Sequence, residues 1–300
     1  MLLRTLVESW VRQTAQDQIV QAARETLLDT RSSAQAEEPT EAPPPPCQIG
    51  LVFALGIEAG GLIDKLERMQ HRRLSQTVVE HSGWFEKRRI TILQAGVGQE
   101  AASQATDWLL RTHRPDWLIS AGFAGALVAD LHRGHILLAD EVTDLAAQSL
   151  PVDLYIDRAS VVDRPSLHIG RLLTVDELVR SHEKKCELAN ASGAVACDME
   201  THAVVATCRA AGVRCLSIRI ISDDWEEELP PEIETLLDQK SLAAKFGAAA
   251  GAIFRRPSSI KDMWQLHEDA LRASDRLARF LCGTIVQLVN ESPAYPAPSS

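Results

Sequence analysis

From Gln48 onward the sequence alternates short apolar runs with longer segments of helical periodicity. An uninterrupted apolar run predicts a strand buried on both faces, which is typical of parallel sheets. The predicted strands are IGLVFAL (49–55), RITILQA (89–95), WLISAG (117–122), HILLADEV (135–142) and RCLSIRIIS (214–222). Helices are expected at about 59–70, 99–113 and 199–212. We therefore predict a three-layer α/β fold, with a central mixed, mainly parallel sheet covered by helices on both faces.

Segments of different composition flank this region. Residues 1–29 have apolar side chains at helical spacing and predict an amphipathic helix, which could contact the body, a partner or a membrane surface. Residues 30–46 are small, acidic or proline, which is typical of a linker. The catalytic domain is then expected at 47–254. A C-terminal helical segment at 255–291 and a disordered tail at 292–300 complete the predicted organisation.

The charge and the cysteines restrict the function classes. The chain has 31 basic and 41 acidic residues, a formal net charge of −10. Nucleic acids and anionic membranes favour basic surfaces, so a small-molecule substrate is the expected partner. The six cysteines are scattered, with no CxxC pair and no Cys/His cluster at zinc spacing. We expect reduced thiols, a cytoplasmic location, and neither a metal nor an organic cofactor.

Polar residues and glycines follow the predicted strands, where ligands bind in open α/β sheets. Glu58 follows the first strand and Asp223 follows the last. The glycine turns GVGQEAA (96–102) and GFAGAL (122–127) would bring backbone N–H groups close to a ligand. Structural explanations stay open, because Glu58 could serve only a helix dipole and Asp223 could be only an N-cap.

An arginine inside a predicted central strand is harder to explain structurally. Arg219 must be paired there, which indicates a nearby carboxylate or an anionic ligand. Glu200 begins the predicted helix at 199–212 and adds a carboxylate. His202 is expected on a helix face, and the Trp225-Glu-Glu-Glu run is either a solvated acidic loop or a mobile flap.

Together these positions resemble the nucleoside phosphorylase and nucleosidase superfamily, and most closely its 5′-methylthioadenosine/S-adenosylhomocysteine nucleosidase branch. The resemblance covers about residues 49–230 in the family's order, and the paired motifs Met199-Glu200 and Arg219…Ser222-Asp223 make it specific. It implies an α/β fold, often a homodimer, that cleaves the N-glycosidic bond between a ribose and a purine. The stretches are IGLVFALGIEAG (49–60), AGVGQEAA (95–102), PDWLISAGFAGAL with HRGHILLADEV (115–142), and CDMETHAVVATCRAAGVRCLSIRIISD (197–223).

The resemblance also implies a role for each matching residue. Asp223 matches the aspartate that protonates adenine N7, and Glu200 matches the glutamate that holds the ribose hydroxyls. Met199 resembles the residue packed against the sugar. Glu58 matches the carboxylate that orients the attacking water, with Arg219 beside it.

Four further residues are expected to contact substrate, and two of them differ from the residues that the family has at these positions. Gly98 and Gly122 occupy the glycine loops of the substrate site. Phe123 stands where the family's GSAGG loop has a serine. Leu178, within TVDELV (174–179), stands where the family's GDxFI stretch has the phenylalanine that stacks on adenine. These two departures leave the preferences for the base and the 5′ group open.

The chemistry needs an acid and a base on opposite sides of the bond. Cleavage builds positive charge on the sugar and negative charge on the departing base. Asp223 would be the acid, with a pKa raised by burial and by Asp224. Glu58 would stay ionised because Arg219 is nearby.

Water is the expected nucleophile. Phosphate binding gathers arginines, and neither 56–61 nor 96–102 contains one. A phosphorolytic enzyme remains an alternative. The sequence also resembles hopanoid-associated nucleoside phosphorylases in its Asp-Met-Glu-[ST]-His and Leu-Pro-Pro patterns. The substrate of such a phosphorylase could be a lipid-linked adenosyl compound. A non-catalytic nucleoside-binding member is the other alternative.

Overall fold

The computed structural model describes residues 46–154, 164–229 and 257–290, all of them within the unit formed by residues 44–300. The helix expected at 1–29, the linker up to residue 45 and the tail at 292–300 lie outside the described residues. Residues 230–254 of the expected catalytic domain also lie outside them. None of the helices within the described ranges combines the length and the apolar character needed to cross a membrane.

The described residues form one ten-stranded sheet and five helices. The strands are β1 (Ile49–Phe53), β2 (Glu67–Arg73), β3 (Val79–Phe85), β4 (Arg88–Gln94), β5 (Trp117–Ala126), β6 (Ile136–Thr143), β7 (Ser149–Pro151), β8 (Leu167–Thr174), β9 (Ala196–Asp198) and β10 (Arg214–Asp223). The helices are α2 (Gly56–Ile63), α3 (Gln99–His113), α5 (His182–Ser192), α6 (Thr201–Ala211) and α9 (Pro257–Asn290). Helix α9 lies within the segment expected to be helical at 255–291.

The sheet is mixed, with parallel strands at its centre. Its order is β10-β6-β8-β9-β5-β1-β4-β3-β2, with β7 paired to β6 and a further pairing between β10 and β5. Strands β10, β5, β1 and β4 are mutually parallel, whereas β2 and β3 extend one side as an antiparallel hairpin. The carboxyl ends of the central strands therefore meet at one edge of the sheet.

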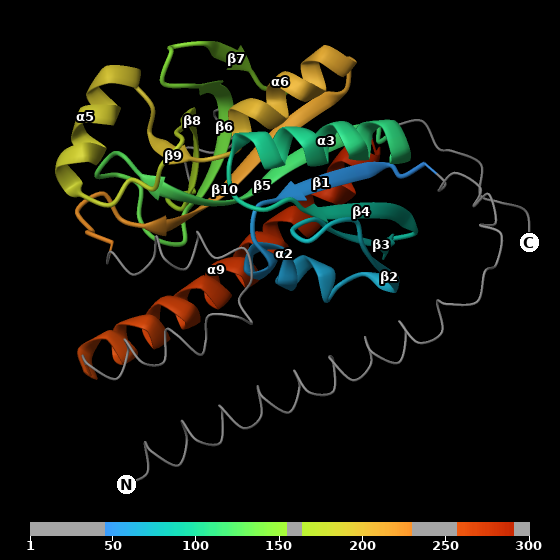
Figure 1. Ribbon diagram of the computed structural model, residues 1–300, viewed down its shortest axis with the longest axis horizontal. Coiled ribbons are helices and arrows are strands. Elements are labelled where there is room, and N and C mark those ends of the chain that lie inside the picture. Colours follow the sequence, from blue (N-terminus) through green and yellow to red (C-terminus); the bar gives the residue numbers. More distant parts are fainter. Residues whose placement is uncertain (1–45, 155–163, 230–256, 291–300) are drawn as a thin grey trace, which may run out of the picture. The chain divides into compact units, whose positions relative to one another are not determined.

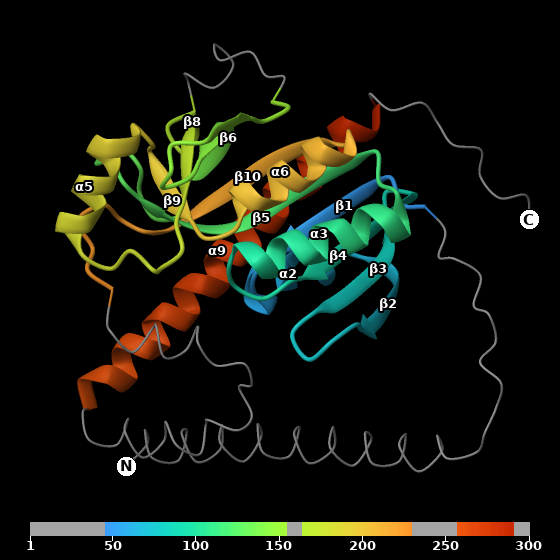
Figure 2. The same cartoon turned by 45° about the horizontal axis from the view of Figure 1, so that its top comes forward.

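Helices cover both faces of the sheet (Figure 1), which confirms the expected three-layer α/β class. Ile49, Leu51 and Phe53 of β1 pack in the core under α2 and α9, and Val52 packs in the core under α3 and α6. A strand buried in this way needs apolar side chains at successive positions, which explains the continuous run in the sequence. Figure 2 shows α5 beside β9, at the end of the sheet away from β2.

The helix predicted at 59–70 is wrong in its second half. Helix α2 ends at Ile63, and Glu67–Arg73 forms the edge strand β2 paired with β3. The spacing of Leu62, Leu66 and Met69 imitates a helix, but Met69 is 46% exposed. Pairing with β3 has overridden the local periodicity.

A buried acidic residue links the hairpin to α3. Glu80 of β3 accepts hydrogen bonds from Ser82 and Arg72, each at 2.9 Å, and lies 3.3 Å from the ring of His113 at the end of α3. Burial by itself raises the pKa of Glu80, but His113, Arg72 and Ser82 outweigh burial and lower this pKa to about 2. The ionised carboxylate is therefore more stable in the folded chain than in the unfolded chain.

We expect Glu80→Gln to reduce the free energy of unfolding at pH 7 by about 2–3 kcal/mol. Because the folded-state pKa is lowered, this contribution is complete above pH 4.5 and is lost as the pH falls toward about 2. Urea unfolding of both proteins across this range measures the difference. Glu86→Gln, at an exposed position in the turn between β3 and β4, is the matched control. A difference that stays constant between pH 7 and pH 2 would contradict the assignment.

Candidate active site

The predicted site residues lie at the edge where the parallel strands end. Glu58 is in the first turn of α2, just after β1. Arg219 and Asp223 of β10 stand opposite Gly122 and Gly125 of β5 in the sheet register. The fold thus brings residues from three distant parts of the chain to one place.

Glu58 accepts hydrogen bonds both at the start of its own helix and from β5. One carboxylate oxygen accepts a hydrogen bond from the backbone N–H of Leu55, and the other accepts one from the backbone N–H of Phe123, both at 2.8 Å. The residue is 5% exposed, and burial raises its pKa against the effects of these N–H groups and of Arg219. The expected effect of Arg219 on Glu58 is therefore present but smaller than that of burial.

Arg219 pairs with a carboxylate that was not among the predicted site residues. Its guanidinium lies 2.8 Å from Asp198 Oδ2 and donates to Ser120 Oγ at 2.7 Å and to Thr201 Oγ1 at 2.5 Å. Asp198 in turn accepts a hydrogen bond from Thr174 Oγ1 at 2.7 Å. The positive charge is thus fixed on the α6 side of the sheet.

Gly122 lets Arg219 and Glu58 meet. A Cβ atom built on Gly122 would lie 2.7 Å from Arg219 Nη1 and 2.8 Å from Glu58 Oε1. Both distances are shorter than any ordinary carbon contact. Gly122 therefore contributes space rather than a contact of its own.

Glu200 adds a third carboxylate to this part of the site. Its Oε1 atom accepts a hydrogen bond from the backbone N–H of Gly98 at 2.8 Å, and Gly98 has a φ of +100° that favours glycine. Burial raises the pKa of Glu200 to about 8, helped by the charges of Asp198 and Glu58 and opposed by Arg219. Glu58, Glu200 and Arg219, which the sequence predicts as site residues, thus share one electrostatic environment.

Asp223 lies against the next glycine of β5. A Cβ atom on Gly125 would be 3.0 Å from Asp223 Oδ2. The carboxylate is 4% exposed, accepts a hydrogen bond from Ser222 Oγ at 2.6 Å, and lies 2.6 Å from the ammonium of Lys185. The cation of Lys185 is therefore paired with Asp223, whereas the Asp224 carboxylate accepts from the backbone N–H of Arg133.

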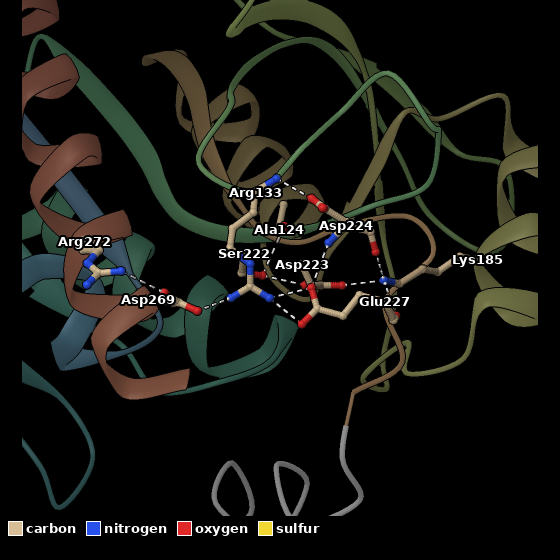
Figure 3. Close-up of polar contacts among 9 residues, drawn as sticks. All are labelled: Ala124, Arg133, Lys185, Ser222, Asp223, Asp224, Glu227, Asp269 and Arg272. Atoms are coloured by element: carbon tan, nitrogen blue, oxygen red, sulfur yellow. Dashed lines mark hydrogen bonds and ion pairs between the residues drawn. The ribbon is translucent and has the colours of Figure 1, made fainter. Parts of the chain in front are cut away.

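The loop after β10 is held by basic residues (Figure 3). The Asp224 carboxylate accepts a hydrogen bond from the backbone N–H of Arg133, and the Arg133 guanidinium pairs with Glu227 and, at 3.1 Å, with Asp269 of α9. Lys185 Nζ also donates to the carbonyl oxygens of Asp224 at 2.6 Å and Glu227 at 3.0 Å. The negative charge of the acidic run that begins at Trp225 is therefore partly neutralised by Arg133, which pairs with Glu227.

Comparisons with known proteins identify the family of this chain. The family described as Phosphorylase superfamily matches residues 48–255, which is more than half of the chain. The chain belongs to the phosphorylase superfamily. A 5′-methylthioadenosine/S-adenosylhomocysteine nucleosidase from Staphylococcus aureus is 27% identical over 217 residues, which cover 65% of this chain and 95% of that protein.

Solved structures share the fold of this superfamily member. S-adenosylhomocysteine nucleosidase from Streptococcus pyogenes, in complex with 5-methylthiotubericidin, has a TM-score of 0.60 and 17% identity over 83% of this chain and 98% of that chain. Futalosine hydrolase from Helicobacter pylori has a TM-score of 0.58 and 19% identity over 81% of this chain and 97% of that chain.

The apolar residues expected to contact substrate lie around the same edge. Met199 is half-buried and packs against the core cluster that contains Leu173, Val179 and Leu188. Phe123 is half-buried and packs against the core cluster that contains Ile119 and Ala121, and its backbone N–H donates to Glu58. Leu178 is half-buried in the segment after β8. Their roles toward a ligand stay predictions.

Sequence reasoning missed Asp198 and Lys185, although both had a signal. Asp198 stands in the Cys-Asp-Met-Glu motif, two residues before Glu200. Lys185 is three residues before Leu188, and these two are the buried residues of α5. A lysine on the apolar face of a short helix needs an acidic partner, which the sequence alone does not identify.

We expect Gly122→Ala to lower the free energy of unfolding by about 1–3 kcal/mol, because the added methyl group displaces Arg219 or Glu58 from its hydrogen bonds. Gly60→Ala is the matched control, since a Cβ atom there meets nothing within 4 Å and alanine is the better helix former. Thermal and urea unfolding of both variants provide the measurement. Equal effects of the two substitutions would show that Gly122 is not tightly surrounded.

Proposed function

We propose that this protein hydrolyses the N-glycosidic bond of a 5′-substituted adenosine, of the methylthioadenosine or S-adenosylhomocysteine type, and releases adenine. The observation that carries the proposal is that Glu58 and Asp223 pack against glycines three residues apart on β5. Both glycines lie at the carboxyl end of β5, so Glu58 and Asp223 reach the same end of the central strands, where ligands bind in open α/β sheets. The identity to nucleosidases over most of the catalytic domain supports the same reaction.

Glu58 is suited to hold and deprotonate the water. Two backbone N–H groups fix the orientation of its carboxylate, and burial raises its pKa, which makes it a stronger proton acceptor. The proton leaves the water as its oxygen bonds to the anomeric carbon of the sugar. Arg219 and the two N–H groups oppose the effect of burial and favour the ionised carboxylate before the reaction.

Glu200 and Asp223 act on the two parts that the cleavage separates: Glu200 on the sugar and Asp223 on the base. Glu200 is held by Gly98 beside Glu58, where its carboxylate can accept hydrogen bonds from ribose hydroxyls and stabilise the positive charge that develops on the sugar. Asp223 lies on the other side of this position and delivers a proton to the departing base. The acid and the base of the reaction thus come from separate elements.

The charges favour water over phosphate as the nucleophile. Glu58, Asp198 and, where it is ionised, Glu200 bring carboxylates to this part of the site, and Arg219 is already paired with Asp198. A phosphate dianion would be repelled by these carboxylates, since phosphate sites gather free guanidinium groups instead. Hydrolysis is therefore the reaction that this arrangement supports.

Adenine release is the decisive assay. We expect turnover of methylthioadenosine, S-adenosylhomocysteine or both at the same rate with and without phosphate. Asp223→Asn is expected to lower kcat about 10²–10⁴-fold, because the departing base loses its proton donor. Asp107→Asn, an exposed change on α3, is the matched control.

Other outcomes would replace the proposal. Formation of a ribose 1-phosphate with strong acceleration by phosphate would identify a phosphorylase. Tight nucleoside binding without turnover would identify a binding protein. Adenosine and futalosine belong in the substrate panel, since one structural neighbour is a futalosine hydrolase.

The pH dependence tests the role of Glu200. Because its pKa is about 8, most molecules carry a protonated Glu200 at pH 7 and an ionised one at pH 9. If the ionised form holds the ribose, kcat/KM rises about tenfold across this range. Glu200→Gln should remove this rise and lower kcat/KM throughout. A profile that stays flat between pH 7 and pH 9 in the unmodified enzyme would contradict the assignment.

A further inference from the structure

Lys185 makes an unusually complete set of contacts for a lysine. Its side chain is fully buried, with 0% exposure, on the inner face of α5. The three donors of its ammonium group face three acceptors: Asp223 Oδ2 at 2.6 Å, the Asp224 carbonyl at 2.6 Å and the Glu227 carbonyl at 3.0 Å. Every N–H of the ammonium therefore has a partner (Figure 3).

This pairing raises a question about the source of the proton. A buried ammonium 2.6 Å from a carboxylate stabilises the ionised form of that carboxylate. A carboxylate has no proton to donate to a departing base. Asp223 must therefore first receive a proton, and the N–H of Lys185 is the donor already directed at its Oδ2 atom.

We propose that Lys185 supplies the proton that Asp223 delivers to the departing base, so that Lys185 and Asp223 act as one proton-holding pair. The inference rests on the proposed function and deepens it. Lys185 acts through Asp223 and has no contact with the base in this scheme. It is therefore a positioning residue that also stores the proton.

The protons and bonds of the reaction balance. The bond between the sugar carbon and the base nitrogen breaks, and its electron pair stays with the base. The base takes a proton from the Asp223 carboxyl, and Asp223 takes one from Lys185 Nζ, which becomes a neutral amine. Water gives its oxygen to the sugar and one proton to Glu58. Solvent then removes the proton from Glu58 and restores the one on Lys185.

The contacts of Lys185 suit both protonation states. A neutral amine keeps two N–H groups, which the carbonyls of Asp224 and Glu227 can still accept. Its lone pair then faces Asp223 and accepts a hydrogen bond from the Asp223 carboxyl group for as long as that group holds the proton. Transfer of the proton therefore leaves no buried donor without an acceptor, which would otherwise cost about 1–3 kcal/mol.

Two substitutions separate proton supply from charge. Lys185→Met removes both, whereas Lys185→Arg keeps a positive charge that does not give up its proton. We expect both variants to lose at least about 100-fold in kcat for adenine release from methylthioadenosine. Lys184→Met is the matched control, because Lys184 is exposed and its ammonium group pairs with Glu187 on the same helix.

A second substrate separates this role from a structural one. A 4-nitrophenyl glycoside of the same sugar releases nitrophenolate, which leaves without being protonated. We expect both Lys185 variants to keep their activity on this substrate within about threefold, and Asp223→Asn to behave like them. Glu58→Gln should lose activity on both substrates, because both need the activated water.

Several results would overturn the inference. With Lys185 absent, a buried Asp223 could be protonated from solvent, and Lys185→Met would keep purine hydrolysis within threefold. Full recovery of that hydrolysis in Lys185→Arg would show that only the charge matters. If both variants fail to fold, the unmodified enzyme decides. The ratio of kcat/KM for methylthioadenosine to kcat/KM for the nitrophenyl glycoside, in which the shared effect of Glu200 cancels, should fall at alkaline pH, and a constant ratio rejects the proton relay.

The two proposals fail in different ways. If the unmodified enzyme releases no adenine from any nucleoside, the proposed function is wrong. If it releases adenine in a manner that depends on Glu58 and Asp223 but not on Lys185, only the proton relay is wrong.

Discussion

Several carboxylates can share one part of this site because a single buried guanidinium lies among them. Arg219 is 3% exposed, and its pairing with Asp198 keeps its charge from being buried alone. Breaking such a pair typically costs about 3–5 kcal/mol, so neither residue can change independently. The neighbouring strand is adapted to it, since Ser120 accepts one of its hydrogen bonds and Gly122 leaves space for it.

The two sides of the site carry different charges, and the difference matches what glycosidic cleavage requires. On the side of Glu58 and Glu200, carboxylates outnumber cations, which favours the positive charge that develops on a sugar and disfavours phosphate. On the side of Asp223, Lys185 balances the carboxylate at 2.6 Å. A base that departs with negative charge therefore meets a neutral pair instead of a second anion.

The sequence predicts the central sheet well because its strands are buried on both faces. The run at 49–55 and the arginine inside 214–222 are signals that only a covered parallel strand explains, and the structure has β1 and β10 at these places. Edge elements were less predictable. Strand β2 is exposed along its whole length, so pairing with β3 decides its conformation and no apolar pattern records it.

The same reasoning explains which site residues could be predicted. Glu58, Glu200 and Asp223 belong to motifs that stand next to strand ends, so their position in the chain indicates their place in the fold. Lys185 lies 38 residues from its partner Asp223, on a separate helix. Such a contact depends on how α5 packs, which the local sequence does not encode.

Helix α9 lies beyond the residues that match the superfamily, yet it contacts both sides of the site. Ser274 donates to the carbonyl of Glu58 at 3.4 Å and accepts from the N–H of Gly61 at 3.3 Å, which ties α9 to the first turns of α2. Asp269 pairs with Arg133, whose guanidinium also holds Glu227 in the loop after Asp223. A shift of α9 would therefore move Glu58 and the loop beside Asp223 together. Because acid and base must keep a fixed separation across one sugar, a rigid helix attached to both is a physical means of maintaining it.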